Sequence, residues 1–378
     1  MEGISRTPYH SLLCGKLAKG CGLCVQGKKM VVFVTGRCAQ RCFYCPVSEH
    51  KFGKDDAYAN EWKIADPTNP VELLEEARLT NATGAGITGG DPLANIKRTC
   101  EYIKLLKSRF GKKFHIHLYT PLRLVTREHL DALYTSGLDE IRVHPDLDDQ
   151  SLWNRIDLAR AYDWDIGIEI PAIPGYEAKT RALVDATHTK ISFLNLNELE
   201  LSDTTTPHYQ LESLGFLPKN DISYGVAGSE TLAHNIMEYA RTKKLATHFC
   251  TARLKDGVQV KKRLIARATN TKGAFGEATG EGTLLFGCCY LSELSPSAGY
   301  RKKLACAGKD IDKKLMIAHK TLLTKKIQNE VDARKKRILL PLPLLRSHIQ
   351  TLKDMTLVPA IVEEHPTADG FEVEIEFL

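Results

Sequence analysis

Seven short apolar segments alternate with six helical patterns between residues 29 and 252, and this alternation constrains the fold more than any other feature of the chain. Strands alternating with helices of this length imply parallel pairing with right-handed crossovers. Six such units and a seventh strand favour a partial (β/α) barrel over a flat doubly wound sheet, since no Gly-x-Gly-x-x-Gly follows the first strand. The predicted strands cover residues 30–35, 85–88, 114–119, 140–144, 166–170, 193–201 and 246–250.

The chain of 378 residues divides into three predicted parts. Residues 1–28 form a cysteine-containing extension, and residues 29–252 form the α/β core. Beyond residue 253 the alternation stops, and the sequence becomes basic and punctuated by Gly, Ser and Thr. We expect residues 253–378 to form a basic α+β accessory module, with a long helix over 310–337 and two strands over 358–363 and 371–377.

The overall composition is that of an ordinary globular protein. Hydrophobic residues make up 43% and charged residues 26% of the chain, which excludes a disordered or fibrous protein. No apolar run approaches the roughly 18 residues of a membrane span, and the N-terminus lacks the apolar segment of a secretory signal. The sequence therefore predicts a cytoplasmic protein with no membrane partner.

The cysteines indicate metal binding. Six of the eleven fall in the first 45 residues, and a reducing compartment disfavours a disulfide framework. Cys38, Cys42 and Cys45 directly follow the first predicted strand. Three thiolates at this spacing can hold three irons of a cubane cluster and leave the fourth iron open to a small molecule.

A zinc site is the alternative interpretation of these cysteines. Cys21-x2-Cys24 and Cys42-x2-Cys45 are separated by 17 residues, a spacing found in zinc ribbons. The chain would then be a zinc-ribbon nucleic-acid-binding protein without catalytic turnover. Cys38 would be surplus in that arrangement, and the segment between the two pairs has the pattern of a barrel strand.

The motif Cys38-x3-Cys42-x2-Cys45, with Tyr44 before the last cysteine, resembles that of the radical S-adenosylmethionine (SAM) superfamily. The resemblance implies that the three cysteines ligate a [4Fe–4S] cluster whose open iron binds SAM. An electron from a donor such as ferredoxin or flavodoxin would then cleave SAM to a 5′-deoxyadenosyl radical. Most of the chain is similar to archaeal proteins labelled as related to pyruvate formate-lyase activating enzyme. The chain is thus expected to be a radical SAM enzyme, of oxidoreductase or transferase type, with its reaction and catalytic residues unassigned.

The same resemblance suggests which residues bind SAM. Gly89-Gly90-Asp91-Pro92 is similar to the family's Gly-Gly-Glu-Pro loop, whose backbone carbonyls receive the amino group of SAM, with Asp91 in place of Glu. All the candidates follow predicted strands, and the ends of barrel strands meet at one mouth. The candidates are Tyr44 and Ile173 near the adenine, Gly89, Gly90 and Asp91 at the amino group, and Thr120 and His144 at the ribose or carboxylate, or in a structural role at the rim.

A second metal site is predicted from Cys21, Cys24 and Cys250. The first two precede the first strand and Cys250 ends the last one, so a partial barrel brings them near each other. The metal would be zinc or another iron–sulfur cluster, and the alternative is a set of inert buried thiols. Candidates for a fourth ligand are Cys14, Cys288, Cys289 and Cys306.

Other polar residues of the predicted strands have structural interpretations. Arg142 and Glu169 point into the barrel by strand alternation and are expected to form an ion pair. His115 and His117 share one face of the third strand. They form a possible metal pair, although histidines in strands are more often structural.

Charge is distributed unevenly along the chain. Residues 241–354 hold 25 Lys and Arg against 9 Asp and Glu, whereas the whole chain has a net charge of only +6. Such asymmetry indicates a polyanionic partner or a solvated basic face. A cluster after the last barrel strand, Lys261, Lys262, Arg263 and Arg267, makes RNA the leading substrate hypothesis. A protein glycyl-radical partner and a small metabolite are the alternatives.

Overall fold

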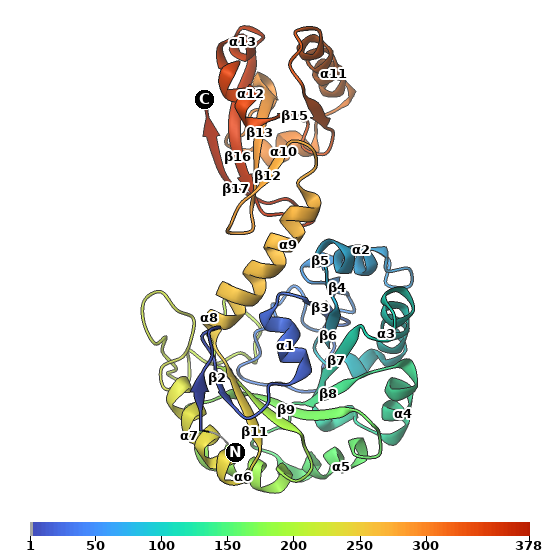
Figure 1. Cartoon of the computed structure of the whole chain (residues 1–378), viewed down its shortest axis with the longest axis vertical. Helices are drawn as coiled ribbons and strands as arrows, with labels where there is room; N and C mark the ends of the chain where they lie inside the picture. Colours follow the sequence, from blue (N-terminus) through green and yellow to red (C-terminus); the bar gives the residue numbers. More distant parts are fainter. Residues whose placement is uncertain (1–2) are drawn as a thin grey trace. The chain divides into compact units, whose positions relative to one another are not determined.

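Seven parallel strands form a curved sheet in the N-terminal part of the chain (Figure 1). The computed structural model describes residues 3–378. Neighbouring strands in the sheet are also successive in the chain, as right-handed strand–helix–strand units require. In spatial order they are β3 (Lys29–Phe33), β6 (Gly84–Thr88), β7 (His115–Thr120), β8 (Glu140–Val143), β9 (Asp165–Ala172), β10 (Phe193–Glu198) and β11 (Ala246–Cys250).

The sheet is a partial barrel, as predicted. Antiparallel strands extend both of its edges: β2 (Leu12–Cys14) and β1 (Ser5–Arg6) follow β11, and β4 (Tyr58–Ala59) and β5 (Trp62–Lys63) follow β3. The strand order therefore runs from β1 to β5 without closing a ring among the described residues.

Helices join the parallel strands and cover their outer side (Figure 1). Thr126 caps α4 (Arg127–Ser136) by accepting a hydrogen bond from the backbone of His129, and Gly137 ends that helix with a φ of 97°. The fourth crossover consists of a 3-10 turn over Gln150–Arg155 followed by the short α5 (Ile156–Ala159). The other connecting helices are α2 (Val71–Leu79), α3 (Ile96–Phe110), α4 (Arg127–Ser136), α6 (Glu177–Thr187) and α7 (Ser229–Thr242).

Helix α1 (Lys19–Val25) lies inside the curve of the sheet and contacts β3, β6 and β7 (Figure 1). Gly20 permits this close approach, because a Cβ there would lie 2.3 Å from His117 Nδ1 and 2.5 Å from Arg142 Nη2. The predicted extension 1–28 thus supplies two edge strands and an internal helix to the same compact unit as the barrel.

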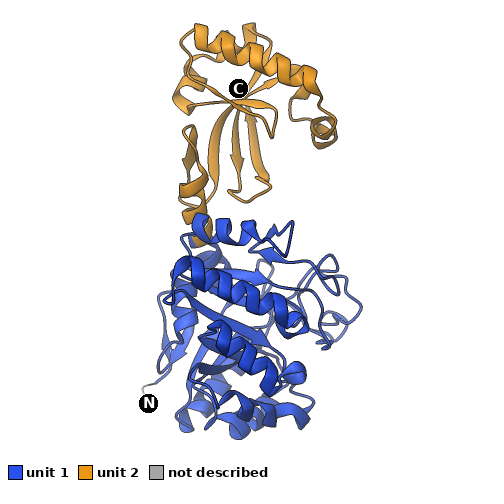
Figure 2. Cartoon of the chain, turned by 90° about the vertical axis from the view of Figure 1, so that its right-hand side faces the viewer, with its two compact units in different colours: residues 1–262 blue, residues 263–378 orange. Residues whose placement is uncertain are grey.

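The chain divides into two compact units, with unit 1 ending at Lys262 and unit 2 beginning at Arg263 (Figure 2). The boundary lies ten residues beyond the predicted one, within α9 (Lys261–Thr271), which follows α8 (Ala252–Leu254) and a π-helical turn over Lys255–Val260. Each unit has its own buried apolar clusters.

Unit 2 is an antiparallel sheet with apolar clusters on both faces. The strands predicted near the C-terminus are present as β16 (Leu357–Glu364) and β17 (Glu372–Phe377). The central strand β13 (Leu284–Leu291) was missed. The remaining elements of unit 2 are β12 (Gly276–Ala278), β14 (Glu330–Asp332), β15 (Arg337–Leu340), α10 (Tyr300–Ala305), α11 (Lys309–Thr324), α12 (Leu342–Ser347) and α13 (Ile349–Asp354).

The predicted long basic helix over 310–337 was wrong in its second half. Helix α11 ends at Thr324, and Lys326 then takes a left-handed φ of 62°. The following residues pair as the hairpin β14–β15. Val331 and Ile338, which face each other in that hairpin, have the β-branched side chains that favour strands.

Candidate functional site

The cysteine loop and the Gly-Gly segment line one cavity at the C-terminal ends of the parallel strands. The cavity measures about 350 Å³. Most of the SAM-binding candidates line it, and so do Tyr119, Glu169 and Asn197, which the sequence did not indicate as ligand-binding. The polar and sulfur-bearing lining residues include Cys38, Cys42, Cys45, Tyr44, Gly89, Gly90, Tyr119, Thr120, His144, Glu169 and Asn197.

The three thiols of the loop are partly buried and protonated in the metal-free chain. Burial raises the pKa of Cys38 to about 11 and that of Cys42 to about 12, and it also raises that of Cys45. Bound iron would stabilise the thiolates against this desolvation, so loading the site would release protons. Three thiols facing one cavity match the donor set of an open-sided cubane cluster.

Gly89 and Gly90 bring the backbone of the second strand against the base of the cysteine loop. Backbone hydrogen bonds of 2.8 Å join Gly90 N to Thr35 O and Asp91 N to Arg37 O. A Cβ on Gly90 would lie 2.8 Å from Cys38 Cβ, and one on Gly89 would lie 2.4 Å from Thr35 O. Only glycine therefore leaves the backbone of this segment accessible beside the thiols.

The side chain of Asp91 makes hydrogen bonds within the fold. It is fully buried, and its Oδ1 accepts hydrogen bonds from Leu93 N at 3.0 Å and from Thr120 Oγ1 at 2.9 Å. Burial raises the pKa of Asp91 to about 6. Asp91 and Thr120 are thus brought together as partners, and only the backbone of the Asp91 segment is placed toward the cysteine loop.

Tyr44 and His144 form a hydrogen-bonded pair on the cavity wall. His144 Nδ1 lies 2.8 Å from the carbonyl oxygen of Glu169, so this nitrogen donates. His144 Nε2, 2.9 Å from Tyr44 Oη, is then the acceptor of the phenol hydrogen. Burial lowers the pKa of His144, which keeps the ring neutral and this arrangement fixed.

Glu169 contributes a charged carboxylate to the same cavity. Burial acts to raise its pKa, but Arg142 and hydrogen bonds from Asn195 and Asn197 outweigh burial and hold the pKa below its usual value. Arg142 Nη1 lies 2.6 Å from Glu169 Oε2, which is the predicted ion pair. The added role in lining the cavity follows from strand alternation at β9, because Glu169 points inward near the strand's C-terminal end.

Ile173 lies beside this cavity, in a second hollow of about 350 Å³ that Cys42, Phe43 and Tyr44 also line. Phe43 links this region to the loop after β10: its carbonyl accepts from Gln210 N at 2.8 Å, and its ring stacks on Phe216. No sequence pattern indicated this contact, because residues 202–228 have no regular periodicity.

Cys21 and Cys24 lie on α1, and Cys250 lies at the end of β11, where it packs with Val25, the last residue of α1, and with Leu254. Asn195 Nδ2 donates to Cys21 Sγ at 3.2 Å. Burial raises the pKa of Cys21 to about 11 and that of Cys250 further, and negative charge on the neighbouring thiols adds to both shifts. Within residues 3–378 these sulfurs do not converge closely enough to hold a single ion.

The predicted fourth ligands are located elsewhere. Cys14 on β2 lies opposite Thr247, and the charges that influence its pKa after burial are those of Arg241 and Glu238 on α7. Cys288 and Cys289 are buried within the sheet of unit 2, and Cys306 follows α10 on the surface of that unit.

The basic cluster after the last barrel strand is not an open cationic surface. Lys262 Nζ donates to Val25 O at 2.8 Å and lies over the ring of Tyr9. Arg267 is buried, and Lys261 and Arg263 are only partly exposed and make further interactions.

No helix among residues 3–378 has both the length and the apolar character needed to cross a membrane.

Comparison with known proteins identifies the family of the core and a relative that shares most of the chain. Residues 32–170 match the sequence model of the radical SAM superfamily. A protein of Methanocaldococcus jannaschii named "Putative glycyl-radical enzyme activating enzyme" is 42% identical over 281 residues, which cover 72% of this chain and 73% of the relative.

Solved structures show more distant similarity. The radical SAM methyltransferase TsrM of Kitasatospora setae, with tryptophan and a SAM analogue bound, matches 48% of this chain at 15% identity with a TM-score of 0.35. SuiB of Streptococcus suis bound to SAM matches 68% at 14% identity with a TM-score of 0.42. The matches span 38% and 59% of those two chains, which is less than two thirds of either.

Proposed function

Because the chain belongs to the radical SAM superfamily, we propose that Cys38, Cys42 and Cys45 hold its [4Fe–4S] cluster and that the adjoining cavity holds SAM. The observation that carries this assignment is the convergence of the three thiols and the Gly89-Gly90 backbone on one cavity. When bound, the cluster and SAM supply reductive cleavage of SAM to a 5′-deoxyadenosyl radical. The reductant is a small electron carrier such as ferredoxin or flavodoxin.

The chain's own residues orient the bound SAM. The backbone carbonyls of Gly89 and Gly90 receive the amino group, since no side chain at these positions blocks approach. Tyr44, fixed by its hydrogen bond to His144, presents its ring to the adenine, with Ile173 beside it. The charged carboxylate of Glu169 places negative charge on the wall of a cavity that takes a cationic sulfonium.

Thr120 and Asp91 act by positioning. The Thr120 hydroxyl bonds to the buried carboxylate of Asp91, which in turn caps the 3-10 turn Pro92–Asn95. This pair fixes the Gly-Gly backbone where β6 ends.

We infer that the substrate is a protein, on which a hydrogen atom is abstracted from the backbone or a side chain. The support is the 42% identical relative, named as an activating enzyme for a glycyl-radical protein. The RNA hypothesis loses part of its support, because the four cations after β11 are buried or make interactions within the fold. A small metabolite is the remaining alternative.

Cys21, Cys24 and Cys250 form the proposed second metal site. The thiols are near enough for their charges to raise one another's pKa but too far apart for one ion, which favours an iron–sulfur cluster over zinc. A cluster spreads its thiolates over separate irons. In a Cys21/Cys24/Cys250 triple Ala variant, iron should fall while the Cys38-loop cluster remains. Unchanged iron and sulfide would show that these thiols are structural.

Formation of 5′-deoxyadenosine tests the enzymatic assignment. The anaerobic, reduced wild-type protein should convert SAM to methionine and 5′-deoxyadenosine slowly without substrate. The Cys38/Cys42/Cys45 triple Ala variant should lose this activity, and a Cys100/Cys306 double Ala variant should keep it. An active triple variant would refute the cluster assignment.

The choice of a protein substrate is tested separately with pyruvate formate-lyase as the probe. Incubation with the reduced enzyme and SAM should produce a glycyl radical detectable by electron paramagnetic resonance (EPR), with one 5′-deoxyadenosine per radical. Substrate-free SAM cleavage without any radical on the probe would leave the radical SAM assignment intact and move the choice toward a metabolite.

A further inference from the structure

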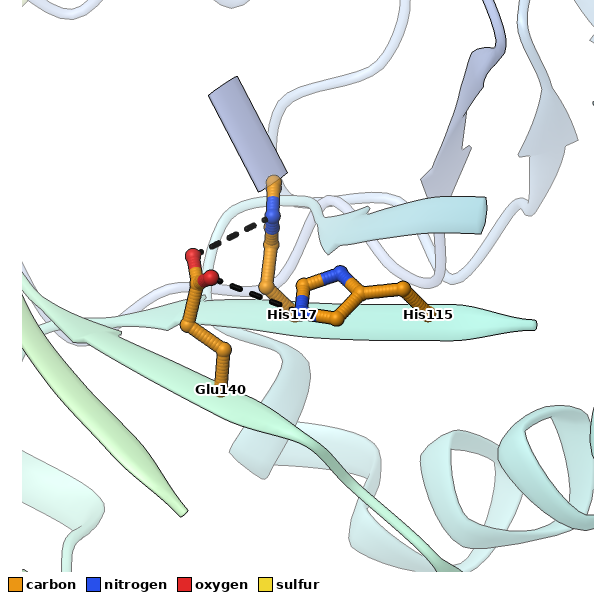
Figure 3. Close-up of side chains that lie close together, drawn as sticks. All are labelled: His115, His117 and Glu140. Atoms are coloured by element: carbon orange, nitrogen blue, oxygen red, sulfur yellow. Dashed lines mark ion pairs between the residues drawn. The ribbon is translucent and has the colours of Figure 1, made fainter. Parts of the chain in front are cut away.

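His115, His117 and Glu140 lie together in the barrel interior (Figure 3). The two histidines come from β7 and the glutamate from the start of β8, and all three side chains are buried. None of the three lines the cavity at the strand ends. This trio of side chains is therefore separate from the proposed SAM site and has no role in the function proposed above.

The ligand atoms of the three side chains converge. One nitrogen or oxygen of each lies within 4.8 Å of the others. His115 Nε2 is 3.5 Å from Glu140 Oε2, and His117 Nδ1 is 3.5 Å from Glu140 Oε1. Ligands at normal zinc–nitrogen and zinc–oxygen distances in a tetrahedron are separated by about 3.4 Å. Each distance to a Glu140 oxygen is therefore close to one edge of a tetrahedral zinc site. Because the two distances run to different oxygens, Glu140 would bind the ion through both oxygens or turn so that one oxygen serves beside both histidines.

His117 Nδ1 also lacks a partner. It is buried without a hydrogen bond, although buried ring nitrogens are normally satisfied. A bound cation would satisfy this nitrogen. His117 Nδ1 points toward the carboxylate of Glu140, whose Oε1 lies 3.5 Å away (Figure 3).

The surroundings of the trio provide outer contacts of the kind that orient metal ligands. Gly20 N of α1 donates to Glu140 Oε2 at 3.3 Å, and Arg142 Nε donates to Glu140 Oε1 at 2.5 Å. The positive charge of Arg142 is shared with Glu169, so two carboxylates face one guanidinium. Hydrogen bonds to a ligating carboxylate fix its orientation toward the metal.

We propose that His115, His117 and Glu140 bind one Zn²⁺, with a water in the fourth position, and that this ion fastens α1 inside the barrel through Glu140 and Gly20. The competing arrangement is a metal-free network in which His115 Nδ1 accepts from Lys29 Nζ at 3.1 Å. The two arrangements predict different metal contents and different ligand shells.

Zinc analysis of the full-length protein, with its [4Fe–4S] cluster in place, distinguishes the zinc site from the metal-free network. The protein, incubated with Zn²⁺ and desalted, should retain one zinc per chain with a nitrogen and oxygen shell in zinc X-ray absorption. His117→Ala should lower zinc retention at least tenfold. His248→Ala is the matched control, because this ring is also buried in the barrel with an unpartnered nitrogen but lies outside the trio; it should retain the zinc.

Three results would overturn the proposal: no retained zinc in the wild-type protein, a sulfur shell around the zinc, or equal loss in both variants. If His117→Ala does not fold, the wild-type zinc content and ligand shell decide alone. Iron and 5′-deoxyadenosine measured on the same samples report on the cysteine site separately.

Discussion

Asp91 illustrates how a residue in a cofactor loop can act through the fold. Its carboxylate is fully buried with two hydrogen bonds to Oδ1 and none to Oδ2, and burial raises its pKa to about 6. The unfolded chain releases this proton near pH 3.9. Between these values the folded state binds more protons than the unfolded state, so the free energy of unfolding falls as pH rises from about 4 to 6.

Asp91→Asn should remove this dependence. The Asn side chain keeps an oxygen that can accept from Leu93 N and Thr120 Oγ1, and it has no proton to lose. Between pH 4 and pH 6 the free energy of unfolding, measured with denaturant, should therefore fall less in Asp91→Asn than in wild type. The difference between the two proteins should be no more than about 3 kcal/mol. Identical pH profiles would mean that Asp91 is ionised normally in the folded protein.

At the scale of elements, α1 offers a test of how the barrel interior is filled. Gly20 and Gly22 lie two residues apart on this helix, but only Gly20 faces buried groups. Gly20→Ala should destabilise unit 1 by about 1–3 kcal/mol, since its Cβ would overlap His117 and Arg142. Gly22→Ala meets nothing within 4 Å and should be neutral or stabilising by up to about 1 kcal/mol. Equal thermal shifts in the two variants would contradict this placement of α1.

The parallel strands were predictable because each has a local signal. Buried parallel strands are continuous apolar runs, and signals such as Thr126 and Gly137 mark where helices start and stop. The placement of α1 inside the barrel was not predictable, since it depends on long-range contacts of Gly20. In unit 2 the run Leu284–Leu291 is interrupted by Gly287 and lies in a Gly-rich stretch, which hid the central strand.

The candidate site was predictable to the extent that its residues lie in motifs. The three cysteines lie within one short loop after the first parallel strand, and Gly89 and Gly90 directly follow the second, so the barrel brings both segments to the same mouth. The partners of Glu169 come from β8 and β10, and only the register of these strands brings them together. The motif assigned Asp91 to the site through its backbone, whereas the burial of its carboxylate against Thr120 is a tertiary feature.

At the scale of the whole molecule, the two units have separate cores. The clusters of unit 2 are formed from residues of that unit alone, among them Cys288, Tyr290 and Leu340. We therefore expect residues 263–378, expressed alone, to fold and to melt cooperatively. Circular dichroism should show a single sigmoidal thermal transition. A fragment without a cooperative transition would mean that unit 2 needs unit 1 to fold.

The central claim is that the cavity beside the cysteine loop holds a [4Fe–4S] cluster with one iron open to SAM. EPR of the anaerobically reduced protein, with iron and sulfide analysis of the same sample, tests it most directly. We expect about four irons and four sulfides attributable to Cys38, Cys42 and Cys45, and a reduced-cluster spectrum that changes when SAM is added. A colourless protein containing zinc alone, or a cluster spectrum that SAM leaves unchanged, would contradict the account.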